Sequence, residues 1–339
     1  MNWEKSKIKN KDGHVVEAQA PIIISASRST DIPAFYSDWF IKRLNEGYVK
    51  WKNPFNGVSS FFSFNKARLI VFWSKNPKPL INYLDFIKQK IENYYFQFTL
   101  NDYDVDKLEP NVPELASRIE TFIQLSEIIG KSKVIWRFDP LILTDKIGVN
   151  DLLEKVENIG NKLKNHTEKL VFSYADIKQY KKVQNNLRKN SIKYQEFNEI
   201  LMKEFAKGLQ KLNAEWQFEL GTCAENISLE KYGIAHNKCI DDDLIIRLFK
   251  NDQKLMDFLG VKIRQPDIFN QQGSVKKTIN NKDKGQRKLC GCIISKDIGR
   301  YNTCPHLCEY CYANSSKEIA LKNWRRYKGN TNCEMIISE

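Results

Sequence analysis

The sequence contains no run of about eighteen apolar residues, so it predicts no helix that spans a membrane. Residues 1–7 are polar and charged, and they lack the apolar centre of a secretory signal. We therefore expect a cytoplasmic protein. Neither G-x-G-x-x-G nor the Walker A pattern occurs, which excludes nucleotide-binding loops of those two types. Internal repeats and low-complexity tracts are absent as well, so the chain does not read as a repeat protein.

The composition is that of a globular protein with a basic surface. Of the 339 residues, 42% are hydrophobic and 28% charged, which suits one large α/β domain or two small ones. The net charge of +13 attracts phosphate groups, so nucleic acid is one expected partner. The alternative is that lysines simply cover solvated helix faces. Five of the eight cysteines lie between Cys290 and Cys311, which favours bound metal in a reducing compartment over disulfides.

Short apolar runs alternate with helical stretches along most of the chain. We expect strands at 22–27, 69–73, 94–99, 134–138, 170–174 and 216–220, and helices at 33–45, 80–93, 113–129 and 151–163, with a long helical region reaching 212. This alternation is typical of βαβ units, so the sequence predicts an α/β fold with a parallel (β/α) TIM-type barrel, full or partial. The barrel would occupy residues 1–270, a polar linker 271–288, and a cysteine-rich segment that completes the barrel 289–339.

Polar side chains follow nearly every predicted strand. Such strand ends form the active site of parallel barrels, so we expect these side chains to line one cavity. Any fold needs polar turns after its strands, but so many charged groups in equivalent positions favour a site. The residues are Ser29, Thr30, Asp31, Ser74, Lys75, Thr99, Arg137 and Asp139.

The cysteine pattern near the end of the chain is its most specific feature. Cys304, Cys308 and Cys311 form C-x3-C-x2-C, with Tyr310 and Tyr312 beside the last thiol. Three thiolates this close in sequence can each bind one iron of a [4Fe–4S] cluster, which leaves the fourth iron open to another ligand. A zinc knuckle is the alternative, although zinc sites usually contain C-x2-C pairs. We predict the iron–sulfur cluster.

The motif and its flanks, Cys-x-x-x-Cys-x-Tyr-Cys-Tyr-Ala, resemble the spore photoproduct lyase-like branch of the radical SAM enzymes. The segments 29–31, 73–77, 98–99 and 137–140 resemble strand-end blocks of that branch, but here the cysteine motif comes last instead of first. Because domain termini often lie close together, a rearranged order is physically tolerable. The chain therefore resembles a circularly permuted radical SAM family of unknown function.

The resemblance implies a cofactor, a reaction type and partners. The cluster would cleave S-adenosylmethionine reductively to a 5′-deoxyadenosyl radical, which abstracts hydrogen from an unknown substrate. A reductase or flavodoxin-type protein would supply the electron. The resemblance assigns cofactor binding to Ser29, Thr30, Asp31, Ser74, Lys75, Thr99, Tyr310 and Tyr312. Lys75, Arg137 and Asp139 are the expected catalytic residues.

Several of these residues have simpler explanations. Asp31 could be a helix N-cap, because Asp is among the preferred residues at that position. Arg137 and Asp139 could pair with each other across the barrel mouth. His306 lies inside the cysteine loop, where we expect it to shield the cluster rather than to bind metal. Trp73 reads as a core aromatic.

Four further cysteines, Cys223, Cys239, Cys290 and Cys292, make a complete set of thiolates for a second [4Fe–4S] cluster or a structural zinc. Buried free cysteine is the alternative for Cys223 and Cys239, because the thiol packs as a small apolar group. A shared site requires the four to converge despite their separation in sequence, and we predict that they do.

The permutation hypothesis makes a geometric prediction. The first strand should lie beside the strand that leads into the cysteine motif, and the cysteine loop should open at the same mouth as Lys75 and Asp31. Two other functions remain open. The chain could be a metal-binding protein that interacts with nucleic acid, or a TIM-barrel hydrolase with a structural zinc.

Overall fold

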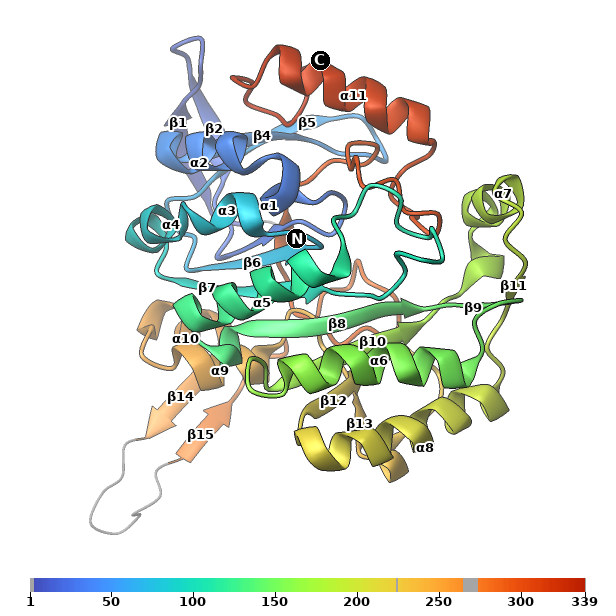
Figure 1. Cartoon of the computed structure of the whole chain (residues 1–339). Coiled ribbons are helices and arrows are strands. Elements are labelled where there is room, and N and C mark those ends of the chain that lie inside the picture. The colour runs from blue at the N-terminus through green and yellow to red at the C-terminus, as the bar shows by residue number, and fades with distance from the viewer. Residues whose placement is uncertain (1–2, 224, 265–273, 339) are drawn as a thin grey trace.

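The computed structural model describes residues 3–223, 225–264 and 274–338, and it shows an α/β fold built on one large sheet (Figure 1). Eight strands run in the order β13-β12-β10-β8-β7-β6-β3-β16, and all neighbours are parallel. Within the described residues β13 and β16 are the edges, so the sheet is open and does not close into a barrel. The strands are β3 (Ile23–Ala26), β6 (Leu69–Ser74), β7 (Asn93–Thr99), β8 (Val134–Leu141), β10 (Lys169–Tyr174), β12 (Glu219–Thr222), β13 (Ile234–His236) and β16 (Lys296–Asp297).

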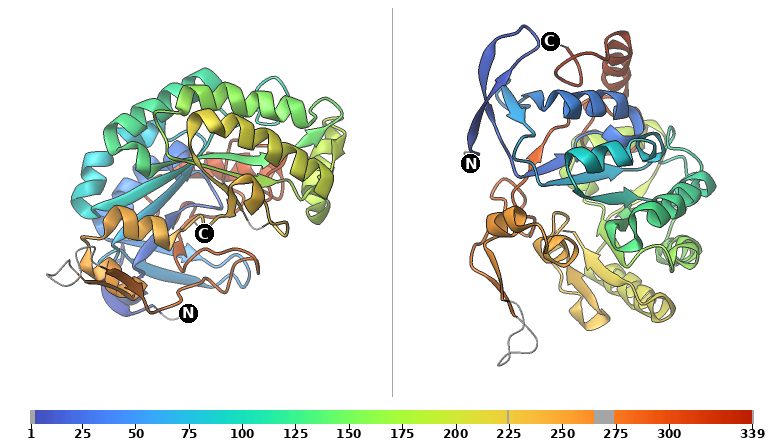
Figure 2. Two further views of the ribbon diagram at one scale, coloured as in Figure 1. Left: turned by 90° about the horizontal axis from the view of Figure 1, so that it is seen from below. Right: turned by 90° about the vertical axis from the view of Figure 1, so that its left-hand side faces the viewer.

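One face of the sheet is covered by the helices that connect its strands. They form an outer arc around the strands (Figure 2). Ile24, Ile70, Phe96, Trp136 and Phe172 of the sheet lie in the core beneath this arc. The helices are α1 (Ile32–Phe35), α2 (Ser37–Glu46), α3 (Lys78–Ile81), α4 (Leu84–Lys90), α5 (Leu115–Ile129), α6 (Val149–Leu163), α7 (Lys181–Lys189) and α8 (Glu199–Trp216).

A second core lies on the other face of the same strands. Because successive side chains of a strand point to opposite faces, Ile23, Leu69 and Val171 belong to this core while their neighbours belong to the first. It is closed by two short helices, α9 (Asp242–Phe249) and α10 (Gln253–Leu259). Apolar residues on both faces explain why the strands read as continuous apolar runs.

The strand β16 confirms the predicted neighbour relationship between the two ends of the chain. Lys296 pairs with Ile24 and Asp297 with Ser25 in parallel register. The junction that follows is tight, because a Cβ placed on Gly299 would lie 1.8 Å from the Ser27 hydroxyl oxygen. The sheet therefore begins with a strand from the C-terminal segment and continues with β3, β6 and the later strands in chain order.

The N-terminal region and the C-terminal tail pack together outside the large sheet, which the sequence did not predict. A small sheet runs in the order β1-β2-β5-β4, and the final helix α11 lies near it (Figure 1). The Trp39 indole donates a hydrogen bond to the Cys333 carbonyl (2.9 Å). These elements are β1 (Lys5–Lys9), β2 (Val15–Gln19), β4 (Tyr48–Lys52), β5 (Ser59–Ser63) and α11 (Lys317–Gly329).

Two local predictions require correction. The sixth strand was expected from Trp216, but Trp216 ends α8 because its ring packs against Gly160 and its indole donates to Asn161 (2.9 Å). The predicted linker 271–288 includes β15 (Ser274–Lys277), which pairs with β14 (Val261–Arg264) in a hairpin, while residues 271–273 lie outside the described part of the chain. A further short pair joins β9 (Leu143–Thr144) to β11 (Tyr194–Gln195).

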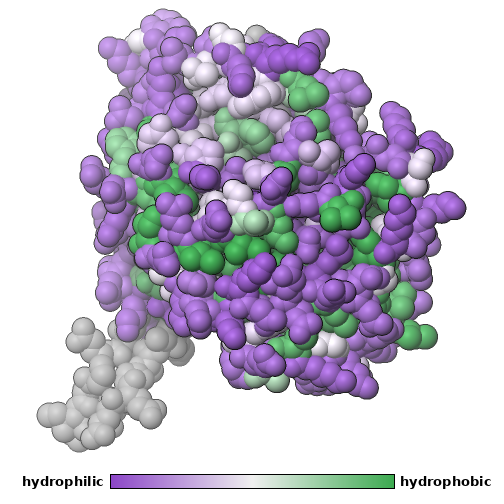
Figure 3. Space-filling view, viewed as in Figure 1, coloured by the Kyte–Doolittle hydropathy of each residue, from purple (hydrophilic) through white to green (hydrophobic). Residues whose placement is uncertain are grey.

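The surface agrees with the hydrophilic composition. The face shown in Figure 3 is mostly hydrophilic, with apolar side chains gathered in smaller patches. Among the described helices, none combines the length and the apolar character needed to cross a membrane.

Candidate functional site

A cavity of about 1020 Å³ opens at the carboxyl ends of the parallel strands, where the cysteine loop also lies. Every site residue predicted from the sequence lines it. The strand-end residues are Ser29, Thr30, Asp31, Ser74, Lys75, Thr99, Arg137 and Asp139, and the aromatics are Tyr310 and Tyr312. The cysteines are Cys223, Cys239, Cys290, Cys292, Cys304, Cys308 and Cys311. The cysteine loop thus lies at the same mouth as Lys75 and Asp31, which is the arrangement that the permutation hypothesis requires.

The cysteine loop is fastened to the N-terminal half of the chain. The Tyr36 hydroxyl donates to the Thr303 carbonyl (2.5 Å), and within the loop itself Asn314 donates to the Cys304 carbonyl (2.9 Å). Burial raises the pKa of the Cys308 thiol well above its usual range, although nearby Lys75 partly opposes this.

His306 lines the cavity, but its ring nitrogens contact other groups and anchor the loop. Its Nε2 lies 2.9 Å from Asp31 Oδ2, and its Nδ1 lies 3.2 Å from the Asn111 carbonyl oxygen. Its ring also makes an edge contact with Phe35. Both ring nitrogens are thus occupied, in agreement with the expectation that His306 is not a metal ligand.

Asp31 joins three parts of the site. It is the N-cap of α1, where Oδ1 accepts from the Ala34 amide (3.0 Å) and from the Ser74 hydroxyl (2.7 Å). Its Oδ2 accepts from the Lys75 amide (2.7 Å) and lies beside His306. The contacts fit the N-cap explanation, and they make Asp31 a positioning residue that ties β3, the end of β6 and the cysteine loop together.

Two polar groups of the loop after β3 have no partner within the described chain. Thr30 Oγ1 and Arg28 Nη2 are buried without a hydrogen bond, and both residues line the cavity. The Arg28 guanidinium lies over the Trp73 ring at 5.3 Å. Trp73 also lines the cavity, so it is not only a core aromatic. Sequence reasoning missed Arg28, and buried unpaired donors of this kind indicate room for a polar ligand.

Lys75 already has an internal carboxylate partner, Glu109, which sequence reasoning missed. Lys75 Nζ lies 2.6 Å from Glu109 Oε1, and Arg118 Nη1 lies 3.6 Å from Glu109 Oε2. Burial by itself would lower the pKa of Lys75. The attraction of Glu109 and the other contacts is stronger, so the pKa of Lys75 is raised above its usual value. The expected pairing of Lys75 with a cofactor carboxylate therefore competes with a buried ion pair.

The two tyrosines of the motif differ in environment. The Tyr310 hydroxyl bonds to Glu109 and accepts from Lys75 (2.9 Å) and from Asn101 (3.0 Å). Tyr312 is exposed at 44%, and its ring lies 5.9 Å from that of Tyr180. Tyr310 therefore belongs to the buried network around Glu109, while Tyr312 is available at the cavity mouth.

Arg137 connects the strand ends with the second set of cysteines. It pairs with Asp139, as the simpler explanation proposed, and Asp139 also accepts from Ser173. Its Nη1 donates to Cys239 Sγ (3.2 Å) and its Nη2 to Cys223 Sγ (3.5 Å). Arg137 is thus a buried cation shared between a carboxylate and two sulfur atoms.

The structure brings cysteines of the second predicted set together at several contacts. The Cys223 and Cys239 sulfur atoms lie 2.7 Å apart. Cys292 Sγ accepts from the backbone amides of Cys239 (3.2 Å) and Ile240 (3.4 Å). Cys290 lines the same cavity, and its contact with Cys292 is the main reason that its pKa is lowered to about 7.

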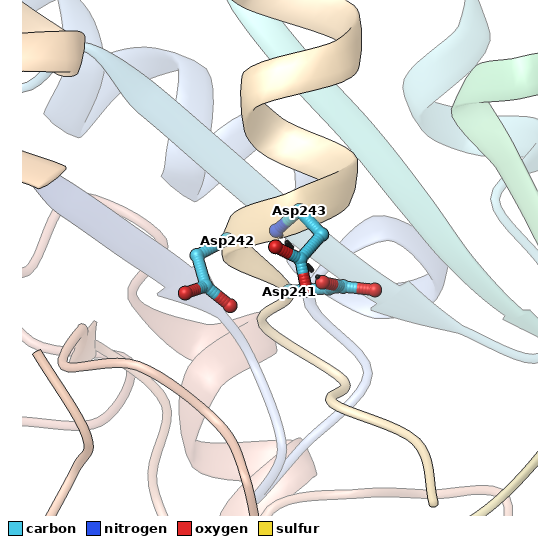
Figure 4. Close-up of side chains that lie close together, drawn as sticks. All are labelled: Asp241, Asp242 and Asp243. Carbon is cyan, nitrogen blue, oxygen red and sulfur yellow. Dashed lines mark hydrogen bonds between the residues drawn. The ribbon is translucent and has the colours of Figure 1, made fainter. Parts of the chain in front are cut away.

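Three acidic residues at the start of α9 lie close together but have a structural explanation (Figure 4). Asp241, Asp242 and Asp243 are the one group of this kind among the described residues whose ligand atoms lie mutually within 4.8 Å. Asp241 caps α9 and pairs with Lys169 (3.1 Å), while Lys238 contacts both Asp242 and Asp243. Each carboxylate therefore already has a cation.

Comparison with known proteins gives one match. The model of a domain of unknown function, DUF1848, matches residues 23–313, from β3 through the cysteine motif. No curated protein and no solved structure matches the chain.

Proposed function

Because the chain belongs to the DUF1848 family, whose function is unknown, its activity has to be argued from the site, and we propose that it is a radical SAM enzyme. The observation that carries the proposal is the shared cavity. The loop of Cys304, Cys308 and Cys311 faces the polar ends of parallel strands, which is where enzymes with such sheets place their active sites.

The three motif cysteines would hold a [4Fe–4S] cluster. When bound and reduced, the cluster would cleave S-adenosylmethionine to a 5′-deoxyadenosyl radical. Among the described residues, no three cysteine sulfur atoms lie mutually within 4.8 Å. Thiolates around a single zinc lie about 3.8 Å apart, given Zn–S bonds near 2.3 Å. A wider spacing suits a cluster, in which each thiolate binds a different iron.

The unpartnered groups of the cavity would bind the cofactor. Arg28 Nη2 offers a cationic donor to a carboxylate, and Thr30 Oγ1 offers a hydroxyl to a neighbouring polar group. We assign these roles to Arg28 and Thr30 in preference to Lys75 and Asp31, whose polar atoms already bind within the chain. The latter pair would instead fix the positions of the strand ends and the loop.

The order of the strands supports a permuted arrangement. The cysteine loop follows β16, and β3, β6, β7, β8 and β10 come next across the sheet in chain order. A radical SAM barrel that began at β16 would have its motif after the first strand. We therefore propose that the open sheet is a circularly permuted partial barrel.

The test is anaerobic reconstitution with iron and sulfide, followed by measurement of 5′-deoxyadenosine with a chemical reductant. We expect a brown protein that forms 5′-deoxyadenosine, and no product from Cys308→Ala. Cys333→Ala is the matched control, because Cys333 does not line the cavity and its carbonyl accepts from Trp39.

Undiminished product from Cys308→Ala would contradict the proposal. Bound zinc without iron would favour a structural metal in a hydrolase or in a protein that binds nucleic acid.

A further inference from the structure

We propose that Cys223, Cys239, Cys290 and Cys292 hold a second iron–sulfur cluster in the wall of the same cavity. This inference concerns ligand chemistry, and it stands whether or not the motif cluster supports radical chemistry. The four thiols come from three separate segments: the end of β12, the turn before α9 and the stretch before β16.

The four cysteines are free thiols gathered at one wall of the cavity. Cys223 Sγ and Cys239 Sγ lie 2.7 Å apart, and the amide of Cys239 donates to Cys292 Sγ (3.2 Å). Cys290 is one residue from Cys292 across Gly291. All four line the cavity. Four thiolates are the natural ligand set of an iron–sulfur cluster.

Hydrogen-bond donors surround these sulfur atoms. Arg137 donates to Cys239 Sγ (3.2 Å) and Cys223 Sγ (3.5 Å), and Asn237 donates to the same two atoms at 3.4 Å and 3.6 Å. Cys292 Sγ accepts from two backbone amides. Neutral thiols packed as small apolar groups need no such donors, whereas metal-bound thiolates are commonly surrounded by them.

Arg28 brings a second buried cation to this wall. Its backbone amide donates to Asp297 Oδ2 (2.8 Å), while Nη2 has no partner in the described chain. Arg28 and Arg137 lie 5.3 Å and 5.4 Å from the centre of the Trp73 ring. Asp139 and Asp297 balance part of the charge of these two guanidinium groups, and the thiolates of a cluster would supply more.

Iron–sulfur fits this set better than zinc or a disulfide. Around zinc all four sulfur atoms would lie about 3.8 Å apart, but no three of the cysteine sulfurs in the described chain lie mutually within 4.8 Å. The 2.7 Å contact between Cys223 and Cys239 has to widen for either kind of ligation. A disulfide between Cys223 and Cys239 would use only two of the four thiols, and it would not account for the two amides that donate to Cys292. On binding, each thiol loses its proton to solvent and forms one bond to iron.

The experiment compares anaerobically purified variants by iron, acid-labile sulfide and zinc content, with Mössbauer spectra to identify the cluster type. Replacing all three motif cysteines, Cys304, Cys308 and Cys311, by alanine should leave about half of the iron, near four per chain if both clusters are [4Fe–4S]. The double variant Cys290→Ala/Cys292→Ala should also lose about half, and Cys333→Ala should lose none.

The two proposals fail differently. If the motif variant keeps all its iron while the Cys290/Cys292 variant loses it all, the second cluster stands and the radical SAM function fails. If the motif variant contains no iron, contains zinc, or shows a Cys223–Cys239 disulfide under strictly anaerobic conditions, the second cluster is refuted. The wild-type iron count, near eight or near four, decides independently should a variant misfold.

Discussion

Asp31 is the residue whose removal should most directly test how the site is assembled. Its carboxylate accepts hydrogen bonds from the Ala34 amide, the Ser74 hydroxyl and the Lys75 amide, and it lies against the His306 ring. We predict that Asp31→Ala destabilises the protein and loosens the cysteine loop, because four donors from three segments lose one shared acceptor.

The magnitude follows from these contacts. Loss of an N-cap alone costs about 1 kcal/mol. A buried donor left without a partner costs about 1–3 kcal/mol, and Asp31→Ala leaves the Lys75 amide and the His306 ring in that state, while the Ser74 hydroxyl can rotate. The total is about 3–7 kcal/mol, a large share of the about 5–15 kcal/mol by which proteins are usually stable.

The assay is urea unfolding of anaerobic protein, with hydrogen exchange over residues 302–314. Asn198→Ala provides the matched control, since Asn198 is an exposed N-cap of α8 whose side chain accepts only from Leu201 (3.0 Å). It should cost about 1 kcal/mol and leave exchange in the loop unchanged. If Asp31→Ala costs no more than Asn198→Ala, or if the loop keeps its protection, then Asp31 does not tie the site together.

Three further predictions concern other parts of the site. Glu109→Gln should destabilise by about 3–5 kcal/mol, because it leaves the buried Lys75 without its carboxylate, while Arg118 keeps its pair with Asp104; an unchanged urea midpoint would contradict this. Gly299→Ala should lower the melting temperature, since its Cβ would collide with Ser27, whereas Gly329→Ala, with open space around it, should not; equal midpoints would exclude the tight junction. Burial lowers the pKa of Lys296 from 10.5 to about 7, so between these two pH values the unfolded chain binds a proton that the folded protein does not. The free energy of unfolding should therefore rise from pH 7 to 10.5 by up to about 1.4 kcal/mol per pH unit. Lys296→Met should remove that rise, and a slope equal to the wild type would show that Lys296 does not cause it.

The strands of the large sheet were the most predictable part of the fold. Runs such as Leu69–Ser74 and Val134–Leu141 are buried on both faces, so their apolar character is continuous and easily read. The small outer sheet was missed because its strands are half exposed and short, as in Lys5–Lys9. An open sheet also could not be distinguished from a closed barrel, because closure depends on how the edge strands meet and not on the pattern within each strand.

The location of the site was predictable, but the detailed roles were not. Polar residues after strands meet at one edge whatever their partners are, so Lys75 and Arg137 were placed correctly in the cavity. The residues that pair with these side chains can lie in loops, where no periodic pattern identifies them. Glu109 lies in the loop after β7, with no pattern that sets it apart, and it takes the charge of Lys75. Arg28 lies between two serines in the sequence, and no pattern there predicts that its guanidinium has a buried nitrogen without a partner.

The position of the cysteine loop at the end of the chain has a physical consequence for how the site forms. The loop is fixed by contacts with residues almost the whole chain away, such as Tyr36 with Thr303 and Trp51 with Gly299 (2.9 Å). Loop closure over such distances costs only about 0.6 kcal/mol more for each doubling of length, so the rearranged order is cheap in stability. The same order is expected to slow folding, because contacts between residues far apart in sequence form slowly. We therefore expect the cysteine loop to dock late in folding, so that a cluster bound by it would be enclosed in a late step of assembly.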